Sequence, residues 1–105
     1  MYERKGELEQ AAAEYERARA LSPDRFSLLN NLGNVYFRQG RIDDAIAAYT
    51  RALQLKEDFA GTHNNLAMAY FKAGEYALAM KHADRAQELG FSVNPQLVQD
   101  LLPYR

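Results

Sequence analysis

A period of 34 residues without gaps constrains this chain of 105 residues more than any other feature. When residues 26–59 are written above residues 60–93, ten positions carry the same residue. A third, incomplete copy appears one period upstream, in residues 1–25. A period of this length indicates stacked copies of one supersecondary unit. The ten identities are Asn30/Asn64, Asn31/Asn65, Leu32/Leu66, Tyr36/Tyr70, Phe37/Phe71, Gly40/Gly74, Ala45/Ala79, Arg51/Arg85, Ala52/Ala86 and Leu55/Leu89.

Each copy is predicted to be a helix–turn–helix unit. In the middle copy, Gly40 is suited to end the first helix because glycine adopts the left-handed backbone conformation easily. Asp43 and Asp44 favour the start of the second helix, where negative charge is stabilised. Spacings of three, four and seven residues place an apolar stripe on each helix. The stripes are Leu29, Leu32, Gly33 and Tyr36, then Ala45, Tyr49, Ala52 and Leu53.

The pattern resembles the tetratricopeptide repeat (TPR), whose 34-residue consensus has a large aromatic residue, then Leu-Gly, Tyr, Gly, Ala, a second aromatic residue, Ala and Pro at fixed places. Departures from the consensus are Leu29 and His63 for a large aromatic residue, Ala83 for the second aromatic residue, and Glu57 and Phe91 for proline. The matches are Leu32-Gly33, Tyr36, Gly40, Ala45, Tyr49 and Ala52 in the middle copy, Tyr2, Gly6, Ala11, Tyr15, Ala18 and Pro23 in the first, and Leu66-Ala67, Tyr70, Gly74, Ala79 and Ala86 in the third.

The resemblance covers about residues 1–91 and implies an all-α fold. We expect a right-handed superhelical solenoid of antiparallel helix pairs, with two full repeats, one partial repeat and a C-terminal capping helix. The expected units are 1–25 (the end of a first helix and a second helix), 26–59, 60–93 and 94–105.

The two ends of the chain are predicted to differ. In the partial repeat, residues 1–5 would be one turn of a first helix, so Ala11, Tyr15 and Ala18 would lack their usual cover. Either the chain was cut from a longer array, or this face pairs with another molecule such as a second copy. At the other end, Asn94 and Pro95 are typical of a helix start. The capping helix is predicted to carry Leu97, Val98, Leu101 and Leu102, and to end at Pro103.

A second, more polar face is expected on the first helix of each full repeat, opposite the apolar stripe. In the TPR family these positions line a concave groove that binds extended peptides. Asparagine is a mediocre helix former, so several of them within a helix suggest a second use. We call this set the asparagine face. Its members are Asn30, Asn31, Asn34, Phe37 and Arg38, with Asn64, Asn65, Met68, Phe71 and Lys72 one repeat on.

Several interpretations of these residues remain open. A carboxamide both donates and accepts, so Asn31 and Asn65 can form a ladder along a peptide backbone, similar to that of the protein O-GlcNAc transferases. Asparagines at these places can equally bridge neighbouring helices. The phenylalanines either pack between helices or contact a ligand. The cations Arg38 and Lys72 are either solvated or meet an acidic ligand.

A clamp for a C-terminal carboxylate, found in chaperone-binding members of the family, is not expected here. Asn34 and Asn65 match its asparagines. However, Asn30, Pro95 and Gln99 stand where cations are needed. Without cations the charge-assisted hydrogen bonds to a carboxylate are lost.

Composition argues against other classes of function. The net charge is −1 and no basic stripe is present, so nucleic acid is not an expected partner. No stretch reaches the ~20 apolar residues that a membrane helix needs. The chain has no cysteine, which excludes thiolate metal sites and leaves the compartment open. His63 and His82 are interpreted as separate structural residues, so we expect no catalytic residues, metal or cofactor.

Three hypotheses for function follow. The first is a non-enzymatic adaptor that binds an extended peptide or a helix of a partner protein in the concave groove. The second is a self-assembly scaffold that forms homo-oligomers through the N-terminal face. The third is an accessory repeat region of a larger enzyme or secretion component.

Overall fold

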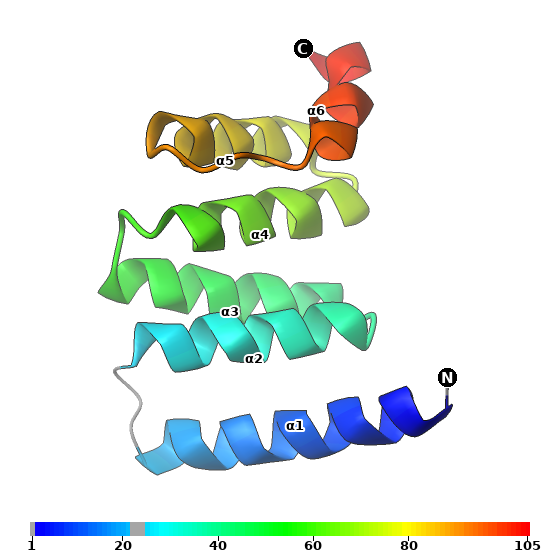
Figure 1. The fold of residues 1–105 in the computed structure, drawn as a ribbon, viewed down its shortest axis with the longest axis vertical. Helices are drawn as coiled ribbons and strands as arrows, with labels where there is room; N and C mark the ends of the chain where they lie inside the picture. Colours follow the sequence, from blue (N-terminus) through cyan, green and yellow to red (C-terminus); the bar gives the residue numbers. More distant parts are fainter. Residues whose placement is uncertain (1, 22–24) are drawn as a thin grey trace.

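The chain forms a column of antiparallel helices stacked in sequence order (Figure 1). This computed structural model describes residues 2–21 and 25–105. Met1 and Pro23, which belong to the predicted partial repeat, lie outside the described residues. The column measures 39 × 32 × 20 Å, and no strand occurs in the part described. The elements are α1 (Tyr2–Leu21), α2 (Phe26–Arg38), α3 (Ile42–Leu55), α4 (Ala60–Lys72), α5 (Tyr76–Glu88), α6 (Pro95–Leu101) and a 3-10 helix, η1 (Leu102–Tyr104).

Glycines end three of these helices in the left-handed conformation. The predicted end at Gly40 is confirmed, because its φ angle is 80° and it comes directly after Gln39, the C-cap residue of α2. Its N–H donates to the carbonyl of Phe37 (3.0 Å), and the N–H of Arg41 donates to that of Tyr36 (2.8 Å). These bonds satisfy carbonyls that a helix end leaves free. Gly74 and Gly90 end α4 and α5 in the same way, with φ angles of 81° and 89°.

α1 departs from the prediction for the partial repeat. We expected a break at Gly6 between the end of one helix and the start of the next. Instead α1 runs without interruption from Tyr2 to Leu21. Gly6 is exposed, no atom lies within 4 Å of where its Cβ would be, and it has no positive φ angle. Nothing at this position therefore forces the chain to turn.

Close packing between the two helices of a pair depends on small residues facing large ones. A Cβ added to Gly33 on α2 would lie 2.5 Å from a ring carbon of Tyr49 on α3. In the next pair the equivalent residues are Ala67 and Ala83, both buried. Compared with the first pair, the residue on α4 is larger than its equivalent on α2, and the residue on α5 is smaller than its equivalent on α3. Each pair reaches the dense packing of a protein interior by its own combination of sizes.

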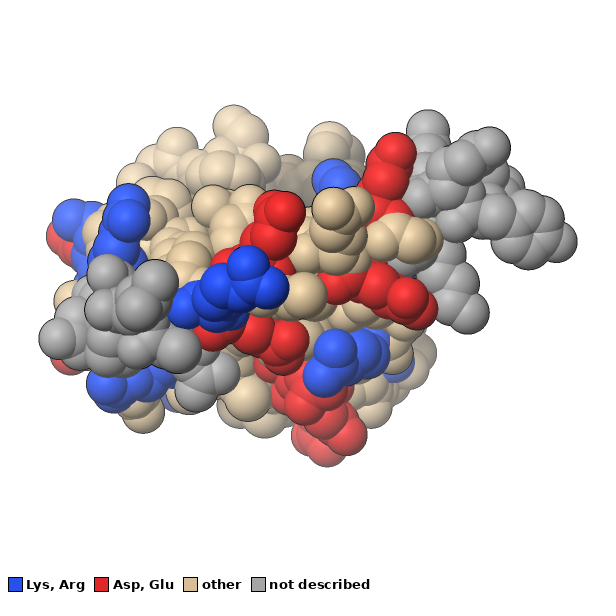
Figure 2. All heavy atoms as spheres, turned by 90° about the horizontal axis from the view of Figure 1, so that it is seen from below, with Lys and Arg blue, Asp and Glu red and all other residues tan. Residues whose placement is uncertain are grey.

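The outward face of α1 is charged rather than apolar. Acidic and basic side chains spread across this end of the column, as seen from below in Figure 2. Ala11, Tyr15 and Ala18 are only half-buried, and the first two pack against the core shared with α2 and α3. Their equivalents on α3 are at most 2% exposed, since α2 covers them. α1 therefore lacks part of the cover that α3 receives.

The C-terminal cap forms largely as predicted. The side chain of Asn94 accepts from the N–H of Gln96 (2.9 Å), and Pro95 begins α6. Leu97 and Leu101 are buried against the core of the α4–α5 pair. Leu102 does not join them, because the chain enters η1 there and leaves this side chain 59% exposed.

The last residues are tied back onto α5. Tyr104 stacks on Tyr76 with ring centroids 3.8 Å apart. Arg105 forms an ion pair with Asp84 at 2.8 Å. The cap is thus anchored at both of its ends.

Candidate peptide-binding face

Asn30 is the centre of a hydrogen-bond bridge between α2 and α4. Its Oδ1 accepts from the hydroxyl of Thr62 (2.8 Å) and from the side-chain amide of Asn65 (3.1 Å). Thr62 is fully buried, so this bridge satisfies a hydroxyl that would otherwise be costly to bury. Asn30 and Asn65 are therefore in direct contact. The Oδ1 of Asn30 and the amide nitrogen of Asn65 take part in hydrogen bonds that hold α2 and α4 together.

Asn34 and Asn31 have different surroundings on α2. The Oδ1 of Asn34 accepts from the hydroxyl of Tyr49 at 2.5 Å, which links α2 to α3. Burial is the main reason that the pKa of Tyr49 is raised above its ordinary value. Asn31 is exposed, and no hydrogen bond joins its side chain to any described residue.

Asn64 and Met68 lie together on α4. Asn64 is 9% exposed, and its amide nitrogen lies 3.9 Å from the Met68 sulfur. Its Oδ1 has no hydrogen-bond partner among the described residues. Asn64 is the repeat equivalent of Asn30, whose partners come from the first helix of the following repeat, α4. At the second junction that helix is replaced by α6, where Gln96 donates to Asp100 instead (2.8 Å).

The two phenylalanines of the face lie between helices. Phe37 is half-buried and packs against the core around α2 and α3. Phe71 is half-buried against the second core, with its ring edge-on to Tyr76 at 5.4 Å. Such aromatic pairs contribute about 0.5–1.5 kcal/mol beyond the area that they bury.

Arg38 and Lys72 are exposed in the last turns of α2 and α4. Positive charge is favourable there because it complements the helix dipole. At the places where a carboxylate clamp needs further cations, Pro95 starts α6 and Gln99 lies exposed on it.

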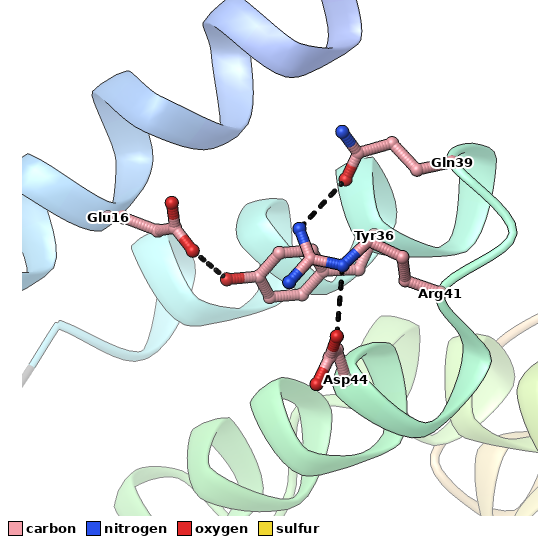
Figure 3. Close-up of polar contacts among 5 residues, drawn as sticks. All are labelled: Glu16, Tyr36, Gln39, Arg41 and Asp44. Carbon is pink, nitrogen blue, oxygen red and sulfur yellow. Dashed lines mark hydrogen bonds and ion pairs between the residues drawn. The ribbon is translucent and has the colours of Figure 1, made fainter.

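Tyr36 joins α2 to α1 and orders the turn into α3 (Figure 3). Its hydroxyl donates to the carboxylate of Glu16 at 2.5 Å. The guanidinium of Arg41 lies over its ring, 4.3 Å from the centroid, and donates to Asp44 at 2.9 Å. Burial first, and then the bond to Glu16, raise the pKa of Tyr36 to about 12. The first two helices are thus connected by polar as well as apolar contacts.

The interpretation of His63 and His82 as separate residues is wrong. Their Nδ1 atoms lie 3.0 Å apart, although nineteen residues separate them in sequence. His82 is half-buried rather than on an outer face. The pair could not be predicted from the distance of nineteen residues along the chain, because only the packing of α4 on α5 brings the two rings together.

Comparison with known proteins places this geometry in a family. The sequence matches the family described as "TPR repeat" over residues 1–40 and 33–74, and that described as "Tetratricopeptide repeat" over residues 60–89. The fold and the repeat thus define a helical solenoid of stacked pairs. The chain belongs to the tetratricopeptide repeat family.

Solved structures with the same fold are numerous. The crystal structure of MamA is 30% identical, with a TM-score of 0.76 over 79% of this chain and 48% of that chain. Another MamA structure, from AMB-1, is 24% identical, with a TM-score of 0.78 over 90% of this chain and 51% of that one. This chain therefore spans about half the length of the MamA structures.

The first TPR of Spaghetti (RPAP3), bound to the HSP90 peptide SRMEEVD, is 22% identical, with a TM-score of 0.83 over 95% of this chain and 79% of that one. A search of curated proteins finds no match. The TPR fold is generally a non-enzymatic module for protein–protein interaction, and the predicted solenoid class is confirmed. No helix in residues 2–21 or 25–105 is both long and apolar enough to cross a membrane.

Proposed function

We propose that the asparagine face binds an extended segment of a partner protein, chiefly through the backbone of that segment. The observation that carries this proposal is that some asparagines of the face form hydrogen bonds between helices and others do not. Asn30 and Asn34 hold helices together, whereas Asn31 is exposed and unengaged within the described chain. The side-chain oxygen of Asn65 is also unengaged there, since only its amide nitrogen meets Asn30.

These free groups lie on α2 and α4, which the Asn30 bridge holds next to each other. A carboxamide offers both a donor and an acceptor, which suits the alternating N–H and C=O groups of an extended peptide. The half-buried Met68 adds an adaptable apolar contact. A domain of the same fold bound to a peptide, the first TPR of Spaghetti, supports peptide binding as the function.

The scarcity of cations on this face gives a free C-terminus no advantage over an internal peptide segment. Arg38 and Lys72 are the only Lys or Arg residues of the asparagine face. Pro95 and Gln99 add no charge to it. We therefore expect a peptide amide and the same peptide with a free carboxylate to bind equally well.

The proposal is tested with peptides selected from a random library on the immobilised chain. Asn31→Ala should weaken their binding up to about tenfold, the loss expected for one hydrogen bond of about 1 kcal/mol or slightly more. Thr50→Ala, an exposed substitution on α3, is the matched control and should leave affinity unchanged. Affinities by calorimetry and helicity by circular dichroism are measured together. Unchanged binding by Asn31→Ala at full helicity would contradict the proposal.

A second candidate is self-association through α1. It is favoured by one observation, the half-exposed Ala11, Tyr15 and Ala18, whose equivalents on α3 are buried. The charged side chains at this end of the column oppose it (Figure 2).

A further inference from the structure

His63 and His82 connect three segments of the last repeat. His63 lies on α4 and is 8% exposed, and His82 lies on α5. Their Nδ1 atoms are 3.0 Å apart, and the Nε2 of His63 lies 2.8 Å from the carbonyl oxygen of Glu57. Glu57 belongs to the loop between α3 and α4. One pair of rings therefore fastens two helices and a loop.

The partners of the two rings fix where the protons are. A carbonyl oxygen only accepts, so we assign the hydrogen of His63 to Nε2. The Nδ1 of neutral His63 is then an acceptor, and His82 must donate to it from its own Nδ1. If His63 took up a second proton at Nδ1, two donors would face each other and the bond would be lost. A second proton on His82 would go to its Nε2 and would put a positive charge into this half-buried site.

The geometry is that of a direct hydrogen bond and not of two ligands around a shared ion. The ring centroids are 5.3 Å apart, and the Nδ1 atoms are 3.0 Å apart. The difference is about twice the radius of an imidazole ring, so each nitrogen points straight at the other. No group of three or more His, Cys, Asp or Glu side chains within the described ranges is placed to hold a metal ion.

The surroundings disfavour a positive charge on His82. Its ring stacks on that of Tyr70, 5.6 Å away, on α4. Burial, followed by His63 and then Lys81, lowers the pKa of His82 to about 4. The two rings line a cavity of about 420 Å³ with both cationic and anionic neighbours. These neighbours are Glu57 from the loop, and Lys81, Arg85 and Glu88 from α5.

The preceding repeat shows that the fold does not require this pair. At the equivalent positions α2 and α3 carry Leu29 and Ala48, which are 2% and 7% exposed. The same packing site is therefore filled by apolar side chains in one repeat and by a titratable pair in the next.

We propose that His63 and His82 form a proton-sensitive latch, which holds α4, α5 and the α3–α4 loop together while both rings are neutral. When α5 moves away from α4, His82 regains contact with water and takes up a proton more readily. Acid therefore favours the open arrangement of the last repeat.

The direction and size of the effect follow from linkage. His82 has a lower pKa in the closed state, about 4, than its ordinary value of 6.5. The latch is then complete above pH 6.5 and is lost progressively as the pH falls toward 4. Between pH 7 and pH 5 we expect opening of α4–α5 to become about tenfold more frequent, less than the full shift would give because the ring is partly exposed.

Hydrogen exchange measures this opening directly. Protection factors of amides in α4 and α5, corrected for intrinsic exchange rates, should fall about tenfold between pH 7 and pH 5. The equivalent amides of α2 and α3 are the control within the same molecule and should change little. An equal fall in both pairs of helices would contradict the latch.

The double variant His63→Leu/His82→Ala gives the second control, since it copies the residues of the preceding repeat. It should fold and show no such fall in α4–α5. The same fall in this variant would overturn the proposal. Zn²⁺ alone is added to both proteins at pH 7 as a further test. A rise in Tm of the wild type that the double variant lacks would show a metal site and overturn the latch.

Discussion

Gly33 is the residue at which the fold tolerates the least additional volume. An added Cβ would lie 2.5 and 2.6 Å from two ring carbons of Tyr49. Tyr49 is 2% exposed and its hydroxyl is held by Asn34, so the ring has little freedom to move aside. Overpacking of this kind typically costs 1–3 kcal/mol.

We therefore expect Gly33→Ala to lower the free energy of unfolding by about 1–3 kcal/mol, although alanine is the better helix former. Urea denaturation monitored by circular dichroism measures the change. In a Tyr49→Ala background, which imitates the Ala67/Ala83 pair, the cost should vanish. Equal costs in both backgrounds would show that the ring is not responsible.

The sequence predicted which residues share the face of the candidate site, but not which of them contact one another. The period placed Asn30, Asn31 and Asn65 on one side of α2 and α4. It could not say which of them meet, because the Asn30–Asn65 bond depends on how far apart the two helices stack. His63 and His82 were missed for the same reason. A usable signal existed, since His63 and His82 lie in one repeat at positions where the preceding repeat carries the apolar residues Leu29 and Ala48.

At the scale of elements, most helix ends follow from local chemistry. Gly40 and Asn94 act through their own backbone and side chain, so the sequence predicts the end of α2 and the start of α6. Gly6 occupies the same repeat position as Gly40 but lies inside α1. The turn at Gly40 joins α2 to a helix that packs back on it. At Gly6 no such partner precedes it within the described chain, and the helix continues.

Because Gly6 lies within a helix and Gly40 lies in a turn, the change from glycine to alanine should alter the free energy of unfolding in opposite directions at these two equivalent positions. Gly6→Ala should raise the free energy of unfolding by about 0.5–1 kcal/mol, because alanine is favoured within a helix and no atom lies within 4 Å of the added Cβ. Gly40→Ala should lower it by about 1–2 kcal/mol, the cost of a left-handed conformation for a residue with a side chain. Thermal unfolding of the two variants beside the wild type checks both signs. A loss of stability in Gly6→Ala would indicate a turn at that position.

At the scale of the whole molecule, the column has two unlike ends. The upper end is closed by α6 and η1, and Arg105, which follows η1, pairs with Asp84. The lower end exposes charged side chains of α1 (Figure 2). Between residues 6 and 18 the charged residues of this helix are all exposed, four acidic and one basic. They are Glu7, Glu9, Glu14, Glu16 and Arg17.

A symmetric dimer through α1 would bring the four exposed glutamates of one copy close to those of the other. Repulsion between like charges should keep the chain monomeric at low ionic strength. Salt at about 1 M shortens the screening length to about 3 Å, so any self-association should strengthen with added salt. Multi-angle light scattering across protein and salt concentrations measures it. A strict monomer under all conditions would exclude α1 as a self-assembly surface for this chain.

The different combinations of residue sizes in Gly33/Tyr49 and Ala67/Ala83 also limit how such a chain can be rearranged by genetic recombination. A crossover within one repeat that placed α4 against α3 would set an alanine against the tyrosine ring. The reciprocal product would set a glycine against an alanine and leave a void. A crossover between repeats would move both partners together and preserve the fit. The unit that this gene can duplicate or exchange without loss is therefore the helix pair, and not the single helix.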